Sequence, residues 1–255
     1  MATRQLTPAQ IERYTSITSK TGYAVAANHI GQKAAVTHDG MSRMSPGIWL
    51  NDEPINVYMA MLQDRDESWV RRGIANRPRT LFLSTFFIEK LMEQNAYDYD
   101  KVRRWTSAAK FRRSGIKPYK SIADVDKIVF PINLGNSHWV CAVANIRDRR
   151  VEWYDSLGRV ERKYINAIKR WVKHDFKDKH PNTPLGSYDT ANWAELLNPP
   201  TTPRQDDGYN CGVFTAMAAS YIGADKPFNY GAQHGDYLRQ RMALEVIDVR
   251  LWNLR

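Results

Sequence analysis

The sequence predicts an α+β fold, in which a mostly antiparallel central sheet is flanked by helices. Three runs, at residues 127–133, 139–146 and 151–155, are rich in β-branched and aromatic residues, and the second is apolar on both faces. A strand buried on both faces is typical of the centre of a sheet. The charged turn at 147–150 makes the second and third runs an antiparallel pair. Apolar residues at helical spacing precede and follow these runs, which predicts the helices.

The segment before the strands is predicted to be mainly helical. Thr7 caps a helix that begins at Pro8, and a connection through Gly31 follows it. A second helix has its cap in residues 49–52 and continues to Leu62. Residues 63–77 are polar and predict a loop or helix end, whereas residues 81–92 are densely apolar and predict a buried helix.

The segment after the strands also alternates between helices and loops. Residues 160–176 predict an amphipathic helix with a basic outer face, and residues 180–202 are rich in Pro and Asn and predict a long surface loop. An apolar helix begins at Cys211, and a closing helix begins at Tyr237.

Length and composition favour one domain with an N-terminal extension. The chain has 255 residues, of which 43% are hydrophobic, and it shows no repeats or linker. We therefore expect a helical extension at 1–40 that packs on a domain at 41–255. The sequence has no apolar run of membrane-spanning length and no signal-peptide core at its start. Two cysteines, Cys141 and Cys211, fit an intracellular, reducing compartment rather than a disulfide framework.

The net charge of +10 raises the question of an anionic partner. Residues 101–120 hold eight basic residues and no acidic one, but no nucleic-acid-binding motif accompanies them. A solvated basic face is the favoured interpretation, with a docking surface for an acidic partner as the alternative. The six histidines are scattered and the cysteines are not paired at zinc spacing, so we expect no metal site.

Cys211 follows a loop at 203–210 that is rich in Asp, Gly and Asn. The unpaired N–H groups and positive dipole end of a helix N-terminus favour a thiolate, which is the nucleophilic form of cysteine. Gly208 and Gly212 leave the sulfur approachable, and Gln205 is a neutral donor within reach of an oxyanion. A buried cysteine on an apolar helix is more often core packing. The polar, glycine-flanked approach favours a nucleophile here.

A cysteine nucleophile needs a nearby base whose ring is held by a third group. His138 opens the predicted central strand and Asp155 ends the next one, and a hairpin brings these two positions to the same edge of a sheet. The Cys211 helix must pack on that sheet, so one edge could carry Cys211, His138, Asp155 and Gln205 together. Spacing alone leaves open whether they meet.

Several short blocks along the chain form one ordered pattern. They are residues 49–56, 84–87, 104–106, 135–139, 152–158, 205–214 and 241–247. In this order they resemble the Ulp/SENP family of SUMO-specific cysteine proteases, and the resemblance extends from about residue 20 to residue 253. Each block alone is weak, but the set in register is specific. The resemblance implies a papain-like, C48-type protease fold with a triad of His138, Asp155 and Cys211, and with Gln205 in the oxyanion hole.

The resemblance also implies how a substrate binds. Trp49 and Trp139 would clamp the Gly-Gly tail of the modifier, and Asp52 would meet a basic residue on its globular face. A tail without side chains can be selected by flat aromatic walls that exclude anything bulkier. Taken alone, Trp49 would more often be a core residue. Three features depart from the family pattern: Ser137 before the histidine, Asn210 where Asp is common, and a longer segment at 64–77.

The implied enzyme cleaves after the C-terminal Gly-Gly of SUMO, maturing precursors and removing SUMO from lysine isopeptide bonds. The alternatives are a protease for another ubiquitin-like modifier such as NEDD8, an acetyltransferase on the same scaffold that uses Cys211, and a non-catalytic binding module. The complete set of site residues favours the protease. We expect SUMO and SUMO-conjugated proteins as partners, no nucleic acid, no cofactor, a monomer, and a location in the nucleus or cytoplasm, with the family resemblance favouring the nucleus.

Overall fold

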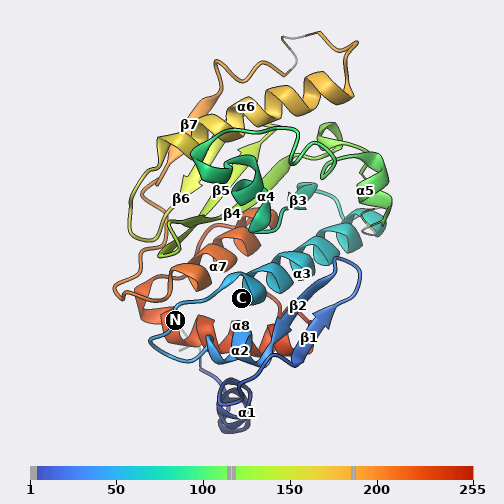
Figure 1. The fold of residues 1–255 in the computed structure, drawn as a ribbon. Helices are drawn as coiled ribbons and strands as arrows, with labels where there is room; N and C mark the ends of the chain where they lie inside the picture. Colours follow the sequence, from blue (N-terminus) through green and yellow to red (C-terminus); the bar gives the residue numbers. More distant parts are fainter. Residues whose placement is uncertain (1–4, 114–115, 117–118, 185, 187, 255) are drawn as a thin grey trace.

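The computed structural model describes residues 5–113, 116, 119–184, 186 and 188–254. Its main sheet has the strand order β3-β4-β5-β6-β7, and helices lie on both faces (Figure 1). The strands are β3 (Thr80–Phe82), β4 (Lys127–Leu134), β5 (His138–Asn145), β6 (Arg150–Tyr154) and β7 (Ala194–Leu197). β4, β5 and β6 pair antiparallel, whereas β3 and β7 pair parallel at the two edges. The α+β prediction is confirmed.

β5 is the central strand, as predicted. All of its residues are buried. Cys141 and Val143 point into one core, and Val140, Ala142 and Ala144 point into the other. This alternation follows from the period of two along a strand, so one apolar run serves two cores.

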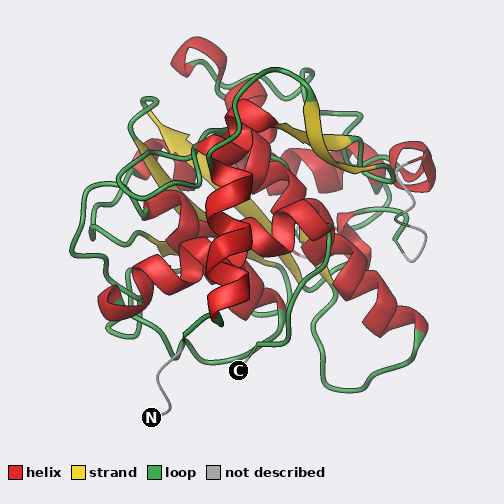
Figure 2. Ribbon diagram, turned by 90° about the horizontal axis from the view of Figure 1, so that it is seen from below, coloured by secondary structure: helices red, strands yellow, loops and turns green. Residues whose placement is uncertain are grey.

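Helices cover each face of the sheet and enclose these cores. One core holds side chains of α3 (Asp52–Arg71), α7 (Cys211–Gly223) and α8 (Gly235–Asp248). The other holds side chains of α4 (Phe86–Leu91) and α6 (Arg162–Lys179). Figure 2, seen from below, shows helices lying across the strands. The molecule therefore has three layers, with the sheet between two groups of helices.

The N-terminal part contains a β-hairpin that was not predicted from the sequence. Helix α1 (Pro8–Thr18) has the predicted cap, Thr7, whose side chain accepts from the Gln10 backbone N–H while the Gln10 side chain accepts from the Thr7 backbone N–H. The predicted connection through Gly31 is instead the antiparallel pair β1 (Val25–His29) and β2 (Ala34–Thr37), followed by α2 (His38–Ser42). Glu53 of α3 accepts hydrogen bonds from the Thr37 backbone and hydroxyl, both at 2.8 Å. This contact fastens the hairpin to α3, and it cannot be read from local sequence.

The apolar run at 81–92 is not one helix. Its start pairs with β4 as strand β3, and only residues 86–91 form α4. The side chain of Asn56 bonds both the backbone N–H and the hydroxyl of Thr85, at 2.9 and 3.0 Å. It holds the chain in a turn between the two elements. A short apolar run fits a strand or a helix equally well, so periodicity cannot separate them.

Two polar segments also differ from prediction. The helix from Asp52 continues to Arg71, through most of the predicted loop at 63–77, because Gln63 and Asp66 accept bonds from the backbone of β3. The predicted loop at 180–202 contains the edge strand β7, which pairs with β6. In the basic run at 101–120, α5 spans Ala108–Arg113, while Lys117 lies outside the described residues.

Candidate active site

His138, Asp155 and Cys211 meet at one edge of the main sheet. His138 is the first residue of β5, and Asp155 directly follows the last residue of β6. Nε2 of His138 lies 2.7 Å from Oδ1 of Asp155. The side chain of Cys211 lies within hydrogen-bonding reach of the same imidazole. The juxtaposition predicted from the hairpin is present.

Cys211 is the first residue of α7, as predicted, and packs among core residues beside the sheet. The structure shows a packing reason for Gly212: a Cβ at this position would lie 3.1 Å from Leu50. The glycine therefore allows the start of α7 to approach the segment before α3. Close packing here fixes where the sulfur lies relative to the groove.

The environment of His138 favours its charged form. Burial disfavours the imidazolium, but the hydrogen bonds to Asp155 and Cys211 outweigh it and raise the pKa of His138 to about 9. Asp155 is fully buried, and its Oδ1 also accepts a bond from the Leu157 backbone at 2.7 Å. The carboxylate is thus fixed while it orients the ring. A positive imidazolium beside a cysteine favours the thiolate.

Gln205 lies on the loop before α7, next to this set. Its Oε1 accepts a bond from the Ser156 hydroxyl at 2.6 Å, and its Nε2 donates to the Asp207 carbonyl at 2.7 Å. Ser156 follows Asp155 in the chain, so Gln205 is anchored to the same strand end. An amide nitrogen carries two N–H groups, and the Asp207 bond uses one of them. The second N–H is available to an oxyanion.

Trp49, Trp139 and Asp52 line one groove, which has a volume of about 570 Å³. Trp139 is buried, with an exposed fraction of 4%, and its Nε1 donates to the Leu50 carbonyl at 2.9 Å. Trp49 is 48% exposed, and its Nε1 donates to the Gly208 carbonyl at 2.7 Å. Trp49 is therefore not a core residue. Its indole is held against the loop that leads to Cys211, so it forms a fixed wall.

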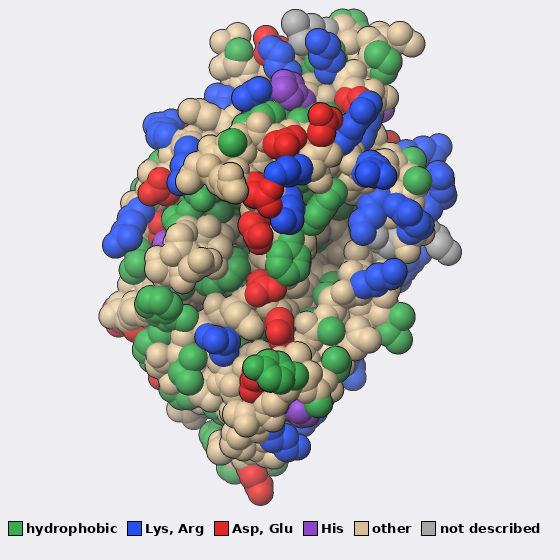
Figure 3. Space-filling model, in the orientation of Figure 1, with side chains coloured by type: hydrophobic (Ala, Val, Ile, Leu, Met, Phe, Trp, Pro, Cys, Tyr) green, Lys and Arg blue, Asp and Glu red, His purple; other side chains and the backbone are tan. Residues whose placement is uncertain are grey.

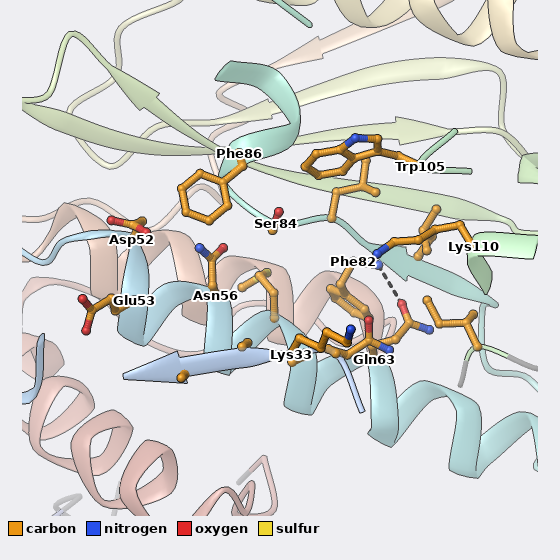
Figure 4. Close-up of a pocket in the computed structure, with 18 of the residues that line it drawn as sticks. Lys33, Asp52, Glu53, Asn56, Gln63, Phe82, Ser84, Phe86, Trp105 and Lys110 are labelled. Atoms are coloured by element: carbon orange, nitrogen blue, oxygen red, sulfur yellow. Dashed lines mark hydrogen bonds between the residues drawn. The ribbon is translucent and has the colours of Figure 1, made fainter. Parts of the chain in front are cut away.

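A second, adjoining cavity of about 450 Å³ shares Asp52 and Phe86 with this groove. Figure 4 shows Asp52 and Glu53 at one end of it and Lys110 at the other, with Phe86 and Trp105 above. Figure 3 shows the same face hollowed, with acidic side chains along one side and basic ones along the other. The cavity is thus polar at both ends and apolar between them.

Asp52 lies at the junction of the two spaces. Among the described residues, its carboxylate has no hydrogen bond to another side chain, and burial raises its pKa. Its neighbour Glu53 is occupied by Thr37. Asp52 is therefore the carboxylate that can pair with a cation of a ligand.

Arg239 of α8, which was not predicted from the sequence as a site residue, is a buried side chain that connects the loops of the site. It donates to the Asn210 side chain at 2.8 Å and to the Tyr209 carbonyl at 2.7 Å, directly before Cys211. It also donates to the carbonyls of Arg43 and Ser45, in the segment that leads to Trp49. Nothing in the local pattern marks Arg239, although it lies two residues before the block at 241–247.

The supports of Asp155 were also missed. Asn198 accepts a bond from the Asp155 backbone N–H at 2.7 Å, and Arg204 donates to its carbonyl at 2.8 Å. Both residues lie in or beside the segment 180–202, which was predicted to be a long surface loop.

Among the described residues, no group of three or more His, Cys, Asp or Glu side chains is arranged to hold a metal ion. None of the described helices is long and apolar enough to cross a membrane.

Comparison with known proteins agrees with this geometry. The family described as "Ulp1 protease family, C-terminal catalytic domain" matches residues 48–251. The chain belongs to the Ulp1 protease family. This is a family of cysteine peptidases, and the matched range includes every candidate site residue.

Members of the Ulp1 family that resemble this chain are ubiquitin-like-specific and sentrin-specific proteases. Ubiquitin-like-specific protease ESD4 of Arabidopsis thaliana is 27% identical over 94% of this chain and 46% of its own length. Ubiquitin-like-specific protease 1A of the same plant is 29% identical over 89% and 42%. Sentrin-specific protease 2 of Rattus norvegicus is 27% identical over 86% and 33%. The chain spans less than half the length of each of these relatives.

Solved structures show the Ulp1 fold. The C-terminal Ulp1 protease domain in complex with Smt3, the yeast ortholog of SUMO, matches with a TM-score of 0.73 at 22% identity, over 96% of both chains. The Ulp1-like SUMO protease catalytic domain of Chaetomium thermophilum matches with a TM-score of 0.72 at 21% identity, over 97% of this chain and 92% of that one. At 21–22% sequence identity, these matches show that the chain shares the fold of the two structures.

Proposed function

We propose that this Ulp1-family chain cleaves SUMO after its C-terminal Gly-Gly, both in precursors and in lysine isopeptide conjugates. The observation that carries the proposal is the linked set of Cys211, His138 and Asp155 beside a groove walled by Trp49 and Trp139. The relatives named above are proteases for ubiquitin-like and sentrin modifiers, and one similar structure contains a SUMO protein.

In this proposal Cys211 is the nucleophile and His138 is the acid and base. The thiolate attacks the carbonyl carbon of the last glycine, and the C–N bond breaks as the leaving amine takes a proton from the His138 imidazolium. The neutral ring then removes a proton from water, which attacks the thioester. The C–S bond breaks, and the thiolate returns. Asp155 orients the ring and stabilises its positive charge throughout.

Gln205 would stabilise the oxyanion that forms during each attack. Its amide is held by Ser156 and Asp207, so the free N–H is oriented before the substrate arrives. Preorganised donors of this kind lower the barrier because no reorganisation is needed as charge develops. The backbone N–H of Cys211, at the start of α7, is the natural second donor.

The modifier's body would bind over the cavity that adjoins the groove. Its acidic end offers Asp52 to a basic residue of the modifier, and its basic end offers Lys33 and Lys110 to an acidic one. Complementary charges at both ends of an apolar cavity fix the orientation of a partner as well as its identity. This arrangement would place the modifier's tail toward Trp49 and Trp139.

The test is a panel of SUMO, NEDD8 and ubiquitin fusions that share one leaving group. We expect kcat/KM on SUMO to exceed that on the other two, and we expect Asp52→Ala to lower the SUMO value selectively. Equal values on all three fusions would refute SUMO specificity and leave the cysteine protease standing. A higher kcat/KM on the NEDD8 fusion than on the SUMO fusion would identify NEDD8 as the preferred modifier.

A further inference from the structure

A separate cavity of about 650 Å³ lies where α3 and α7 end, away from Cys211. Its lining includes five cationic side chains, namely Arg65, Arg72, Arg77, Lys226 and Arg250, and one acidic side chain, Asp64. Trp69 and Trp252 add aromatic surface, and the chain segment 249–254 forms one wall. Its volume and concave shape are typical of sites that bind small molecules.

The cavity is remote from the candidate active site. α3 and α7 run side by side in the same direction, since Tyr58 contacts Met217 and Arg65 contacts Ser220 (Figure 1). Cys211 begins α7 and Gly223 ends it. At the rise of an α-helix this length is about 18 Å. A ligand here would not touch the reacting groups.

Within the described part of the chain, the five cations form no ion pair, and more distant carboxylates offset their charge only in part. No described carboxylate lies within 4.0 Å of any of the five cations, whereas Asp64 is paired with His29 at 2.8 Å. At longer range, the charges of Asp66 and Glu245 act on Arg65. Those of Asp225 and Asp248 act on Arg77 and Arg250, respectively. Like charges gathered in a concave space raise the local potential and attract anions.

Two of the arginines are held rigidly. The guanidinium groups of Arg65 and Arg77 lie 4.8 and 5.1 Å from the ring centre of Trp69. Arg65 donates to the hydroxyl and carbonyl of Ser220, at 2.9 and 2.8 Å, and Arg77 donates to the Ala224 carbonyl. These bonds cap the end of α7 and use only part of the five N–H donors of each guanidinium. Nε of Arg65 is buried and has no partner.

We propose that this cavity binds a small molecule that carries two or more phosphate groups. Guanidinium forks match phosphate oxygens bidentately, and stacking on Trp69 reduces the conformational entropy lost on binding. Five cations that form no ion pair with a described carboxylate exceed what a single phosphate would neutralise. The concave shape favours a compact ligand over a nucleic acid strand, which follows an extended basic groove.

The experiment is calorimetric titration of the whole chain with inorganic tripolyphosphate and, in parallel, with ATP. The test variant is Arg72→Ala/Arg250→Ala, because both residues are exposed on the rim and neither caps α7. The control is Arg104→Ala/Arg112→Ala, which removes the same charge from exposed positions elsewhere. Loss of two charge-assisted contacts should weaken binding of both ligands by at least about tenfold in the test variant only.

Binding lost equally in both variants would reduce the effect to net charge and overturn the proposal. The proposal would also be overturned if the wild type bound neither tripolyphosphate nor ATP. The same holds if it bound only a phosphopeptide or a single-stranded nucleic acid. A thermal unfolding scan without ligand checks that both variants fold. A single Lys226→Ala variant removes another cation of the same cavity, and it should also weaken the binding of both ligands. The experiment measures ligand binding and not proteolysis, so its result is independent of the proposed function.

Discussion

Cys141 and Cys211 are both buried, but only Cys211 has a base beside it. Cys141 lies inside β5 among core residues, and burial raises the pKa of its thiol. Cys211 begins α7 and hydrogen-bonds His138, whose pKa is raised to about 9. The same residue type is therefore kept as a neutral core group at one position and next to an imidazolium at the other.

We expect Cys211→Ser to abolish cleavage, because a hydroxyl is a far weaker nucleophile than a cysteine sulfur. Cys141→Ser should keep the activity and lose stability, since it places a hydroxyl in an apolar core. The measurement is kcat/KM of both variants on one SUMO fusion, with urea unfolding to record the stability of each. Activity lost only with Cys141→Ser would reverse the assignment.

The residues that the sequence could identify are those that stand at element boundaries. His138 starts β5, Asp155 follows β6 and Cys211 starts α7, so strand pairing and helix signals place all three. Asn198 and Arg239 could not be found in this way. They act through side chains that bond the backbone of distant segments, and no local periodicity records such contacts.

At the scale of elements, α3 shows why polar composition misled the prediction. Gln63, Asp66 and Glu67 are buried although their type suggested a loop. Gln63 and Asp66 accept hydrogen bonds from the backbone of β3, which compensate in part for their burial. Glu67 is less well compensated: Arg71 lies 3.6 Å from Oε2, and Oε1 has no partner. The charge of Glu67 therefore destabilises the fold, and burial raises the pKa of the neighbouring Asp66 as well, to about 6.

Glu67 predicts a pH-dependent stability. Burial first, and then the charge of Asp64, raise the pKa of Glu67 from 4.5 to about 7. The folded state thus binds a proton that the unfolded state has released, so the free energy of unfolding should fall as pH rises from 4.5 to 7. Glu67→Gln should raise this free energy by roughly 1–2 kcal/mol at alkaline pH and change it little in acid.

Urea unfolding of wild type and Glu67→Gln across this pH range measures the effect. The control is Glu12→Gln on α1, where the side chain is exposed and the change should be small at every pH. A Glu67→Gln gain that is the same in acid and alkali would show that its cause is packing rather than ionisation.

At the scale of the whole molecule, the site lies where the sheet meets one of the two helical layers. The sheet supplies His138 and Asp155, and that helical layer supplies Cys211. Trp49, before α3, and Trp139, in β5, supply the walls of the groove. The sequence could predict the sheet hairpin and the helix start separately. It could not predict the shape of the groove, because Trp49 is positioned by Gly208, 159 residues away.

The groove predicts what substrate tail the molecule accepts. Trp139 is buried and hydrogen-bonded to Leu50, and Trp49 is fixed by Gly208, so neither indole can move aside at little cost. A glycine tail has no β-carbon to collide with such walls, and it reaches backbone angles closed to other residues. We expect that changing the penultimate glycine of a SUMO precursor to alanine slows cleavage by on the order of 10²-fold.

The matched control changes the residue after the scissile bond, which lies outside the groove walls and should alter the rate far less. Both substrates are measured by kcat/KM with wild type and with Trp49→Ala. If Trp49 forms the wall, Trp49→Ala should narrow the gap between the glycine and alanine tails, because the methyl group then has space. An alanine tail cleaved as fast as the glycine tail by the wild type would disprove the steric selection. An unchanged gap in Trp49→Ala would assign the selection to Trp139 or to the backbone of the groove.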